Sequence, residues 1–317
     1  MGNDAAAEIA AGGIQLRKEA RISMEKERLT VSLEKVTVEY EFLNRTDQDI
    51  ETEVAFPVPP YEYDPVGRGW AHNFADFHLW IDGREADCRL DIRAKLRGRD
   101  YTGLLNNLGI DIQTFGNLGS EADVDKSQIG RLTVPLREKL SQVGLVGGAF
   151  GFPMWSVHKT YHWRQRFPAH KTLRIRHQYE PVIGFQPVTT AQIRSELKGV
   201  CLDPSLEKSL LALRALKLEK GRRQHGSRFR EGFIYAHAQW VKFLLTTANT
   251  WRTPIKNFEL IVEEPDTTRW NPQPKRVGTS VCWDSTVQRL DKDRSVGGKT
   301  NFIPTRELVV YYFLDFD

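Results

Sequence analysis

The amino-acid sequence predicts a mainly β protein made of two antiparallel β-sandwich-like domains. Apolar and polar side chains alternate over most of the chain, which is typical of half-buried strands. Helical spacing is confined to an insertion at about residues 97–146 and to one helix that begins near Asp203. With 317 residues, 40% of them hydrophobic, the chain can fill one large core or two smaller ones. We therefore expect an N-terminal domain at residues 1–190 and a C-terminal domain at residues 191–317.

Two antiparallel strand pairs are indicated in the first third of the chain. Apolar residues occupy every second position at 36–42 and again at 50–56, and residues 44–49 between them have the composition of a turn. A further hairpin is predicted at Asp82-Gly83, because this dipeptide accepts the two positive φ angles of a tight turn.

Helical spacing replaces this alternation at residues 97–146, where leucine and isoleucine recur every three or four positions. The other predicted helix begins with Asp203 as its N-cap and Pro204 in its first turn, and continues to Gly221. Strand alternation marks the remaining segments, at 155–167, 173–179, 233–247, 258–262, 280–290 and 308–316.

Charge argues against nucleic-acid binding, and hydropathy argues against a membrane-spanning helix. The 45 Lys and Arg residues against 41 Asp and Glu leave a net charge of +4, which is too small for this length to indicate nucleic-acid binding. No apolar run reaches the roughly 18 residues that a membrane-spanning helix needs, so we expect no transmembrane segment. The chain also starts without a basic and then apolar leader, which by itself predicts a cytoplasmic protein.

The three cysteines have different settings. Cys88 shares the apolar side of a predicted strand with Ala86 and Leu90, which favours a buried thiol. Cys201 and Cys282 lie at the borders of predicted elements, where a bridge between them is sterically plausible. An odd number of cysteines leaves at least one without a partner in the chain.

The motifs of common catalytic and metal sites are missing from the sequence. His158 and His162 have the spacing of a two-histidine zinc motif, but on a strand this spacing separates them by about 13 Å. The sequence contains no Gly-x-Ser-x-Gly elbow. The Gly-Gly-Lys-Thr segment at 297–300 lacks the upstream glycine of a phosphate loop, so a hairpin turn is the simpler interpretation of it. We expect no metal and no cofactor.

Tryptophans are the stronger candidates for a binding role. Trp80 alternates with the apolar residues of its strand and should point away from them, whereas Trp251 and Trp270 lie in or near predicted loops. Exposed indole rings could stack on a sugar or on a partner's side chain. The structural alternative is that they fill a second packed layer or a domain interface.

Several short segments, taken in order, resemble the bacterial family of domain of unknown function 4424 (DUF4424). The run from Phe243 to Val262 is the most informative of them, although family members tend to carry glycine where this chain has Thr247 and Lys256. The matching segments are residues 3–14, 54–59, 167–171, 177–181, 200–203, 244–251, 254–255, 258–262 and 280–282.

This resemblance implies an exported protein of Gram-negative bacteria whose mature part begins near an Asn-Asp pair. It therefore implies a periplasmic or secreted protein with a leader that this sequence lacks. Cys201 and Cys282 match family positions, so the resemblance also implies a disulfide between them in an oxidising compartment. It transfers no catalytic or binding residue.

Together these observations predict a non-enzymatic exported protein that binds a partner, either an envelope protein or a glycan ligand, through aromatic-lined loops or its basic face. The candidate binding residues are Trp80, Trp251 and Trp270. The alternative is a hydrolase of envelope glycan or peptide that uses dispersed carboxylates and histidines. Its candidate residues are Asp76, His78 and His162.

Overall fold

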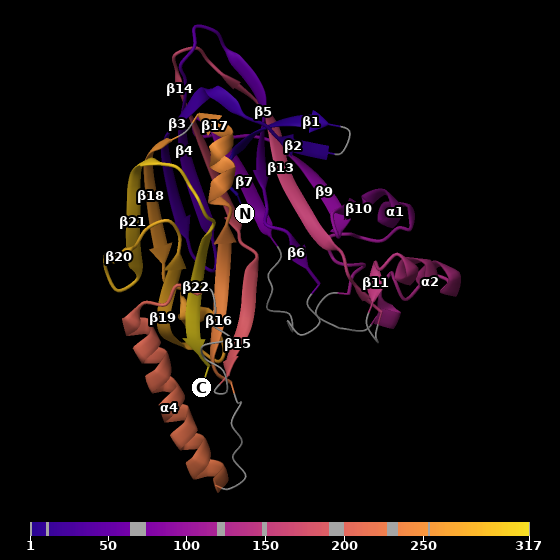
Figure 1. Cartoon of the computed structure of the whole chain (residues 1–317), viewed down its shortest axis with the longest axis vertical. Helices are drawn as coiled ribbons and strands as arrows, with labels where there is room; N and C mark the ends of the chain where they lie inside the picture. Colours follow the sequence, from indigo (N-terminus) through magenta and orange to yellow (C-terminus); the bar gives the residue numbers. More distant parts are fainter. Residues whose placement is uncertain are drawn as a thin grey trace.

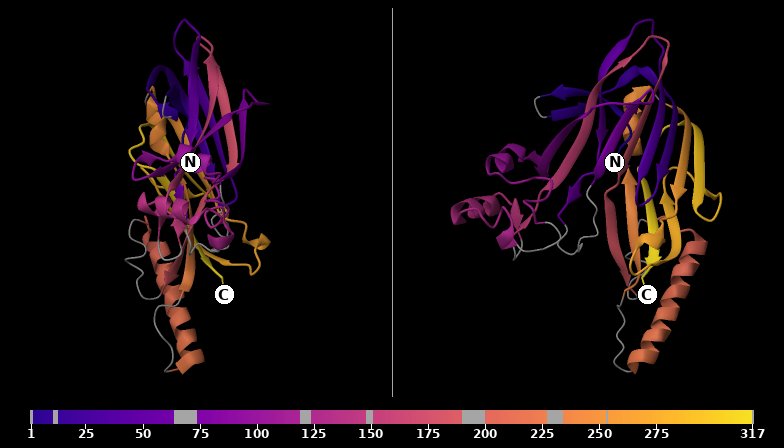
Figure 2. Two further views of the ribbon diagram at one scale, coloured as in Figure 1. Left: turned by 90° about the vertical axis from the view of Figure 1, so that its right-hand side faces the viewer. Right: turned by 180° about the vertical axis from the view of Figure 1, so that it is seen from behind.

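The computed structural model describes residues 2–10, 13–63, 74–118, 124–147, 151–189, 200–226, 234–252 and 254–316. Strands make up 51% of the structure and helices 18%, which confirms a mainly β protein. Two large sheets form a sandwich, a smaller sheet continues from its lower end, and a helical insertion projects from one side (Figure 1, Figure 2).

The first large sheet has nine strands, in the order β20-β21-β18-β3-β4-β14-β7-β8 with β17 beside β3. Neighbours are antiparallel except that β17 and β18 run parallel to β3. Its strands are β3 (Glu19–Val31), β4 (Val36–Asn44), β7 (Ala75–Ile81), β8 (Arg84–Glu85), β14 (Thr172–Glu180), β17 (Trp251–Arg252), β18 (Ile255–Glu263), β20 (Gln288–Arg289) and β21 (Arg294–Phe302).

The second large sheet has seven strands, in the order β10-β9-β13-β5-β1-β2 with β6 beside β13. Aromatic rings pack it against the first sheet, for example Phe77 on Tyr161 at 4.1 Å between centroids. Its strands are β1 (Ala5–Ala10), β2 (Gly13–Leu16), β5 (Ile50–Pro57), β6 (Tyr61–Glu62), β9 (Arg89–Leu96), β10 (Arg99–Asp100) and β13 (Ser156–Phe167).

A four-stranded antiparallel sheet, β15-β16-β22-β19, continues the structure downward, and helix α4 (Pro204–His225) lies along it (Figure 1). The Asp203 side chain accepts hydrogen bonds from the N–H groups of Ser205 and Leu206, which confirms the predicted N-cap. A disulfide joins Cys201 to Cys282, with a Cα–Cα distance of 5.3 Å. The strands are β15 (Ile183–Thr189), β16 (Ile234–Phe243), β19 (Lys275–Cys282) and β22 (Leu308–Asp315).

The segment predicted as a helical insertion contains helices and its own small core. Leu105, Leu140 and Trp155 are fully buried there, in a cluster separate from the main core. The elements of this region are α1 (Thr102–Asn107), η1 (Val124–Lys126), α2 (Val134–Gln142) and the short pair β11 (Val146–Gly147) and β12 (Phe152–Pro153).

Residues from both halves of the chain share the main core. Strand β18 of the C-terminal half pairs with β3 of the N-terminal half, and one buried cluster runs from Ala6 to Leu314. The predicted boundary between residues 190 and 191 lies outside the described residues and remains a prediction.

One expected turn agrees with the structure, and two expected strands differ from it. Asp82 and Gly83 have φ angles of 48° and 79°, which agrees with the predicted tight hairpin. Cys88 lies just before β9 and not within a strand; it is free and half-buried, and burial raises the pKa of its thiol. The strand expected at 233–247 ends at Phe243, because residues Leu245–Thr250 form the 3-10 helix η3.

The interpretation of residues 297–300 as a hairpin turn is wrong. These residues lie inside β21, where Gly297 pairs with Leu260 and Gly298 with Glu259. A Cβ atom on Gly297 would approach the Trp283 ring to 2.8 Å. The glycine therefore allows a buried tryptophan to pack directly on the strand.

The N-terminal segment enters the core and forms a polar cluster there with Glu27 and Tyr40. Asn3 donates to the Glu27 Oε2 atom at 3.1 Å and accepts from the Tyr40 hydroxyl at 3.1 Å. Asn3, Asp4 and Glu27 are all fully buried. Burial raises the pKa of Glu27 well above its usual value, and the nearby Asp4 carboxyl adds to this rise.

This raised pKa predicts a pH dependence of stability. A group whose pKa is higher in the folded than in the unfolded state stabilises the fold at low pH and loses that contribution as pH rises. Wild-type stability should therefore fall by about 1.4 kcal/mol per pH unit above the unfolded-state pKa of Glu27 until the folded-state pKa is reached. Urea unfolding from pH 4 to pH 9 should show a flatter profile for Glu27→Gln. Parallel profiles for the two proteins would contradict this.

Candidate functional site

Trp251 lies in the core and does not belong to a binding surface. It is 0% exposed, its ring packs against Phe42 and Phe167, and its indole N–H donates to the Asp4 carbonyl oxygen at 2.6 Å. The prediction that Trp251 binds a ligand is wrong in this structure, because η3 turns the residue inward onto the N-terminal segment. Loop position alone did not reveal this long-range contact.

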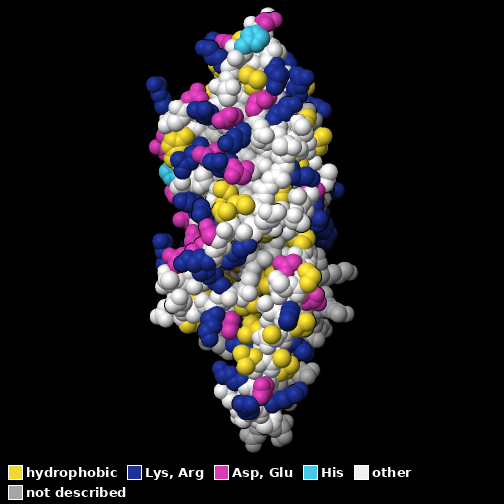
Figure 3. Space-filling view, turned by 90° about the vertical axis from the view of Figure 1, so that its left-hand side faces the viewer, with side chains coloured by type: hydrophobic (Ala, Val, Ile, Leu, Met, Phe, Trp, Pro, Cys, Tyr) yellow, Lys and Arg dark blue, Asp and Glu magenta, His cyan; other side chains and the backbone are white. Residues whose placement is uncertain are grey.

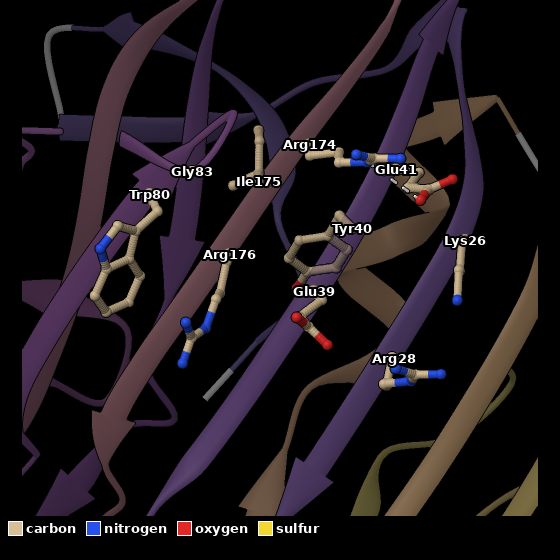
Figure 4. A pocket seen from close by; sticks show the side chains of 10 residues that line it. All are labelled: Lys26, Arg28, Glu39, Tyr40, Glu41, Trp80, Gly83, Arg174, Ile175 and Arg176. Atoms are coloured by element: carbon tan, nitrogen blue, oxygen red, sulfur yellow. Dashed lines mark ion pairs between the residues drawn. The ribbon is translucent and has the colours of Figure 1, made fainter. Parts of the chain in front are cut away.

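Trp80 lies on the outer face of the nine-stranded sheet, as predicted, beside a groove of about 440 Å³ (Figure 4). The Arg176 guanidinium lies 4.7 Å from the centre of the indole ring, and the His78 ring stacks at 5.6 Å. The indole is half-buried and already in contact with these neighbours.

Charged side chains of this groove form alternating basic and acidic pairs across the sheet. Arg176 is opposite Glu39, which is opposite Arg28. Arg28 in turn pairs with Glu259 at 2.6 Å. Such cross-strand pairs stabilise a solvent-facing sheet. Basic and acidic side chains are also interspersed over the upper part of the face drawn in Figure 3. The charged residues of this groove therefore have a structural role in the sheet, which accounts for them without a ligand.

Trp270 lines a pocket of about 500 Å³ that we call the Trp270 pocket. It lies where the nine-stranded sheet passes into the four-stranded sheet, because β14 ends at Glu180 and β15 begins at Ile183. Proline has no N–H for a strand ladder, so Pro181 marks this break. The pocket is lined by Leu33, Glu34, Glu180, Pro181, Ile183, Gln239, Arg269, Trp270, Asn271, Pro272 and Phe316.

An aromatic pair forms one wall of the Trp270 pocket. The Trp270 and Phe316 rings stack with centroids 5.9 Å apart and planes at 16°. Trp270 follows the 3-10 helix η4 (Thr267–Arg269), which Asp266 caps by accepting from the Thr268 N–H. Asp266 also pairs with Arg269 at 3.2 Å, so the charge of this arginine is compensated at the rim.

Two polar groups without partners lie at the end of the core beside this pocket. Gln239 lines the pocket and is 3% exposed, and its Oε1 atom is buried without a hydrogen-bond partner among the described residues. The His237 Nδ1 atom is also buried and unpartnered, and burial lowers the pKa of this imidazole. Residues two apart on a strand face the same side. Gln239 and His237 therefore lie on the same side of β16 as the core residue Val241.

A buried polar group that lacks a partner costs about 1–3 kcal/mol. A ligand that supplies a donor to Gln239 would recover part of this cost on binding. Gln239 and His237 were not among the residues predicted from the sequence, although there was a signal: these two polar residues lie on the same side of β16 as the apolar Val241 and Phe243.

Of the three residues of the hydrolase alternative, Asp76 and His78 are in contact, but His162 is not brought to them. His78 lies on the outer face of β7, between Asp76 at 2.9 Å and Glu85 at 2.8 Å. His162 lies on β13 in the other large sheet, where its Nδ1 atom is 2.5 Å from Glu53. The inward neighbours Phe77 and Tyr161 stack between the two sheets, so the two histidines face opposite outer sides of the sandwich.

Metal-ligand clusters and membrane-spanning helices are both absent from the residues that the structure describes. No cluster of three or more His, Cys, Asp or Glu side chains is arranged there to hold a metal ion. His158 contacts Ser156 at 3.0 Å on the same strand as His162. Among the described helices, none has both the length and the apolar content required to cross a bilayer.

Two solved structures have low similarity to this chain. One is a "putative nutrient binding protein" from Legionella pneumophila, at 12% identity, with a TM-score of 0.42, covering 98% of this chain and 70% of that one. The other is an M1 zinc metallopeptidase from Deinococcus radiodurans, at 9% identity, with a TM-score of 0.29, covering 93% of this chain and 43% of that one. TM-scores below 0.5 do not carry either protein's activity to this chain.

No curated protein matches the sequence. A family model described as domain of unknown function (DUF4424) matches residues 2–311, nearly the whole chain. This agrees with the order of short segments in the sequence, from the buried Asn3-Asp4 to the disulfide-bonded Cys282. The chain therefore belongs to the DUF4424 family.

Proposed function

We propose that this protein is a non-enzymatic binding protein of the bacterial envelope that holds a small ligand in the Trp270 pocket. The proposal rests on the 3% exposed Gln239 beside an aromatic wall, because its Oε1 atom has no hydrogen-bond partner within the described part of the chain. Ligand sites typically have volumes of about 300–1,000 Å³ and combine apolar walls with a few polar groups. The volume of about 500 Å³ lies within that range.

Export is supported by the disulfide between Cys201 and Cys282. Structural disulfides persist in oxidising compartments such as the periplasm and are rare in the cytosol. This favours the periplasmic or secreted location expected from the family resemblance over the cytoplasmic one expected from the first residues. The envelope protein or glycan expected as partner remains a prediction, and the pocket suits a small molecule or the end of a larger one.

Removal of the Trp270 ring should weaken ligand binding strongly. Thermal unfolding should be measured with a library of small organic compounds grouped by charge and apolar length. At a concentration 100 times the Kd, a ligand stabilises the wild-type protein by about 2.7 kcal/mol, which raises Tm by several degrees. We expect Trp270→Ala to lose at least about tenfold in affinity, and with it at least about half of this shift.

The matched control is Trp80→Ala, which removes another half-buried tryptophan outside the pocket. This control should keep the ligand-induced shift. An unchanged shift in Trp270→Ala with loss in Trp80→Ala would move the site to the groove on the nine-stranded sheet. Absence of any shift in the wild-type protein would contradict binding of a small ligand.

A further inference from the structure

The charged side chains that line the Trp270 pocket leave an excess of negative charge. Glu34 and Glu180 contribute two exposed carboxylates, and neither forms an ion pair with another described residue. Arg269 is the basic side chain among the lining residues, and it is paired with Asp266. The pocket therefore offers uncompensated negative charge at its rim.

The groups inside the Trp270 pocket also favour a positively charged ligand. The Gln239 carbonyl oxygen is an acceptor without a donor, and the electron-rich face of an indole attracts cations. The half-buried Trp270 ring is supported by Phe316, so its position does not depend on a ligand. An acceptor, an aromatic face and two carboxylates all favour a positively charged group that carries N–H donors.

We infer that the ligand of the Trp270 pocket is an organic ammonium compound with an apolar chain. This inference rests on the proposed function, since it assigns a chemical class to the same site. The apolar chain would contact Leu33, Ile183 and the two prolines, Pro181 and Pro272. The ammonium group would donate to Gln239 and lie near the Trp270 ring, with Glu34 and Glu180 at the entrance.

The inference can be tested with three probes that share one apolar chain: n-hexylammonium, n-hexanol and n-hexanoate. Isothermal titration calorimetry on the full chain should give n-hexylammonium an affinity about tenfold higher than n-hexanol, with n-hexanoate weakest. This preference should decrease as salt is raised, because the rim carboxylates are exposed and screened.

Two variants separate the contribution of the Trp270 ring from that of the two rim carboxylates. Trp270→Leu keeps an apolar wall, and we expect it to reduce the preference for n-hexylammonium over n-hexanol by about fivefold. The double variant Glu34→Gln with Glu180→Gln should reduce it by about twofold to fivefold and leave n-hexanol binding unchanged. Glu39→Gln, an exposed carboxylate outside the pocket, is the matched control and should change neither affinity.

Equal or tighter binding of n-hexanol or n-hexanoate would overturn the ammonium assignment. If n-hexanol then bound in a Trp270-dependent manner, the proposed function would still stand. Failure of all three probes to bind would also overturn the assignment. In that case a library compound whose Tm shift depends on Trp270 would retain the pocket as a site for a different ligand class.

Discussion

Loss of the disulfide between Cys201 and Cys282 will lower the free energy of unfolding by about 4.5 kcal/mol. The bond joins residues 81 positions apart, and closing so long a loop restricts the unfolded chain strongly. In the folded protein it attaches the segment before α4 to the end of β19, where Ser280 also donates to the Cys201 carbonyl oxygen at 2.6 Å. Reduction should therefore release the start of α4 first.

Guanidinium unfolding of the oxidised and reduced proteins, and of Cys201→Ala with Cys282→Ala, would measure this loss. The reduced protein and the double variant should both unfold at lower denaturant concentration. Cys88→Ser is the matched control, because Cys88 is free and half-buried in this structure. Identical midpoints for oxidised and reduced protein would show that the bond does not restrain the unfolded chain as expected.

Replacement of His177 by leucine should cost about 3–5 kcal/mol of stability. The His177 Nε2 atom lies 3.0 Å from Asp4 Oδ1, and both residues are 0% exposed. Rings of Phe56, Phe77 and Trp163 surround the imidazole, with centroids 5.0–5.3 Å away. Burial raises the pKa of Asp4, and the contact with His177 opposes this rise. Without His177 the carboxyl would be buried with no compensating partner.

A double-mutant cycle isolates this cause. Asp4→Asn added to His177→Leu removes the uncompensated charge, so the double variant should be more stable than His177→Leu alone. The exposed pair of His78 and Asp76 is the matched control, with His78→Leu expected to have a far smaller effect. Strictly additive losses from Asp4→Asn and His177→Leu would contradict a charge-based cause and indicate a packing defect.

His177 and Trp251 show what the local sequence pattern predicts and what it leaves open. The pattern gives the side of a strand that a residue faces, but not its partner from a distant segment. Alternation along β14 puts His177 on the same side as the buried Ile175 and Tyr179. Nothing in that pattern indicated that Asp4, 173 residues away, would be its partner. Trp251 was assigned to a surface for the same reason, because its contact with the N-terminal segment crosses 247 residues.

The sequence by itself determined the mainly β class, the helical insertion, the Asp203 cap, the Asp82-Gly83 hairpin and the family. These features depend on periodicity, on the preferences of single residues or on the order of short segments. The tertiary structure alone decided that β18 pairs with β3, that the N-terminal segment lies in the core and that the Gln239 Oε1 atom has no hydrogen-bond partner among the described residues. The physical reason is that strand alternation specifies which side of a strand a residue faces, but not which distant strand will cover it.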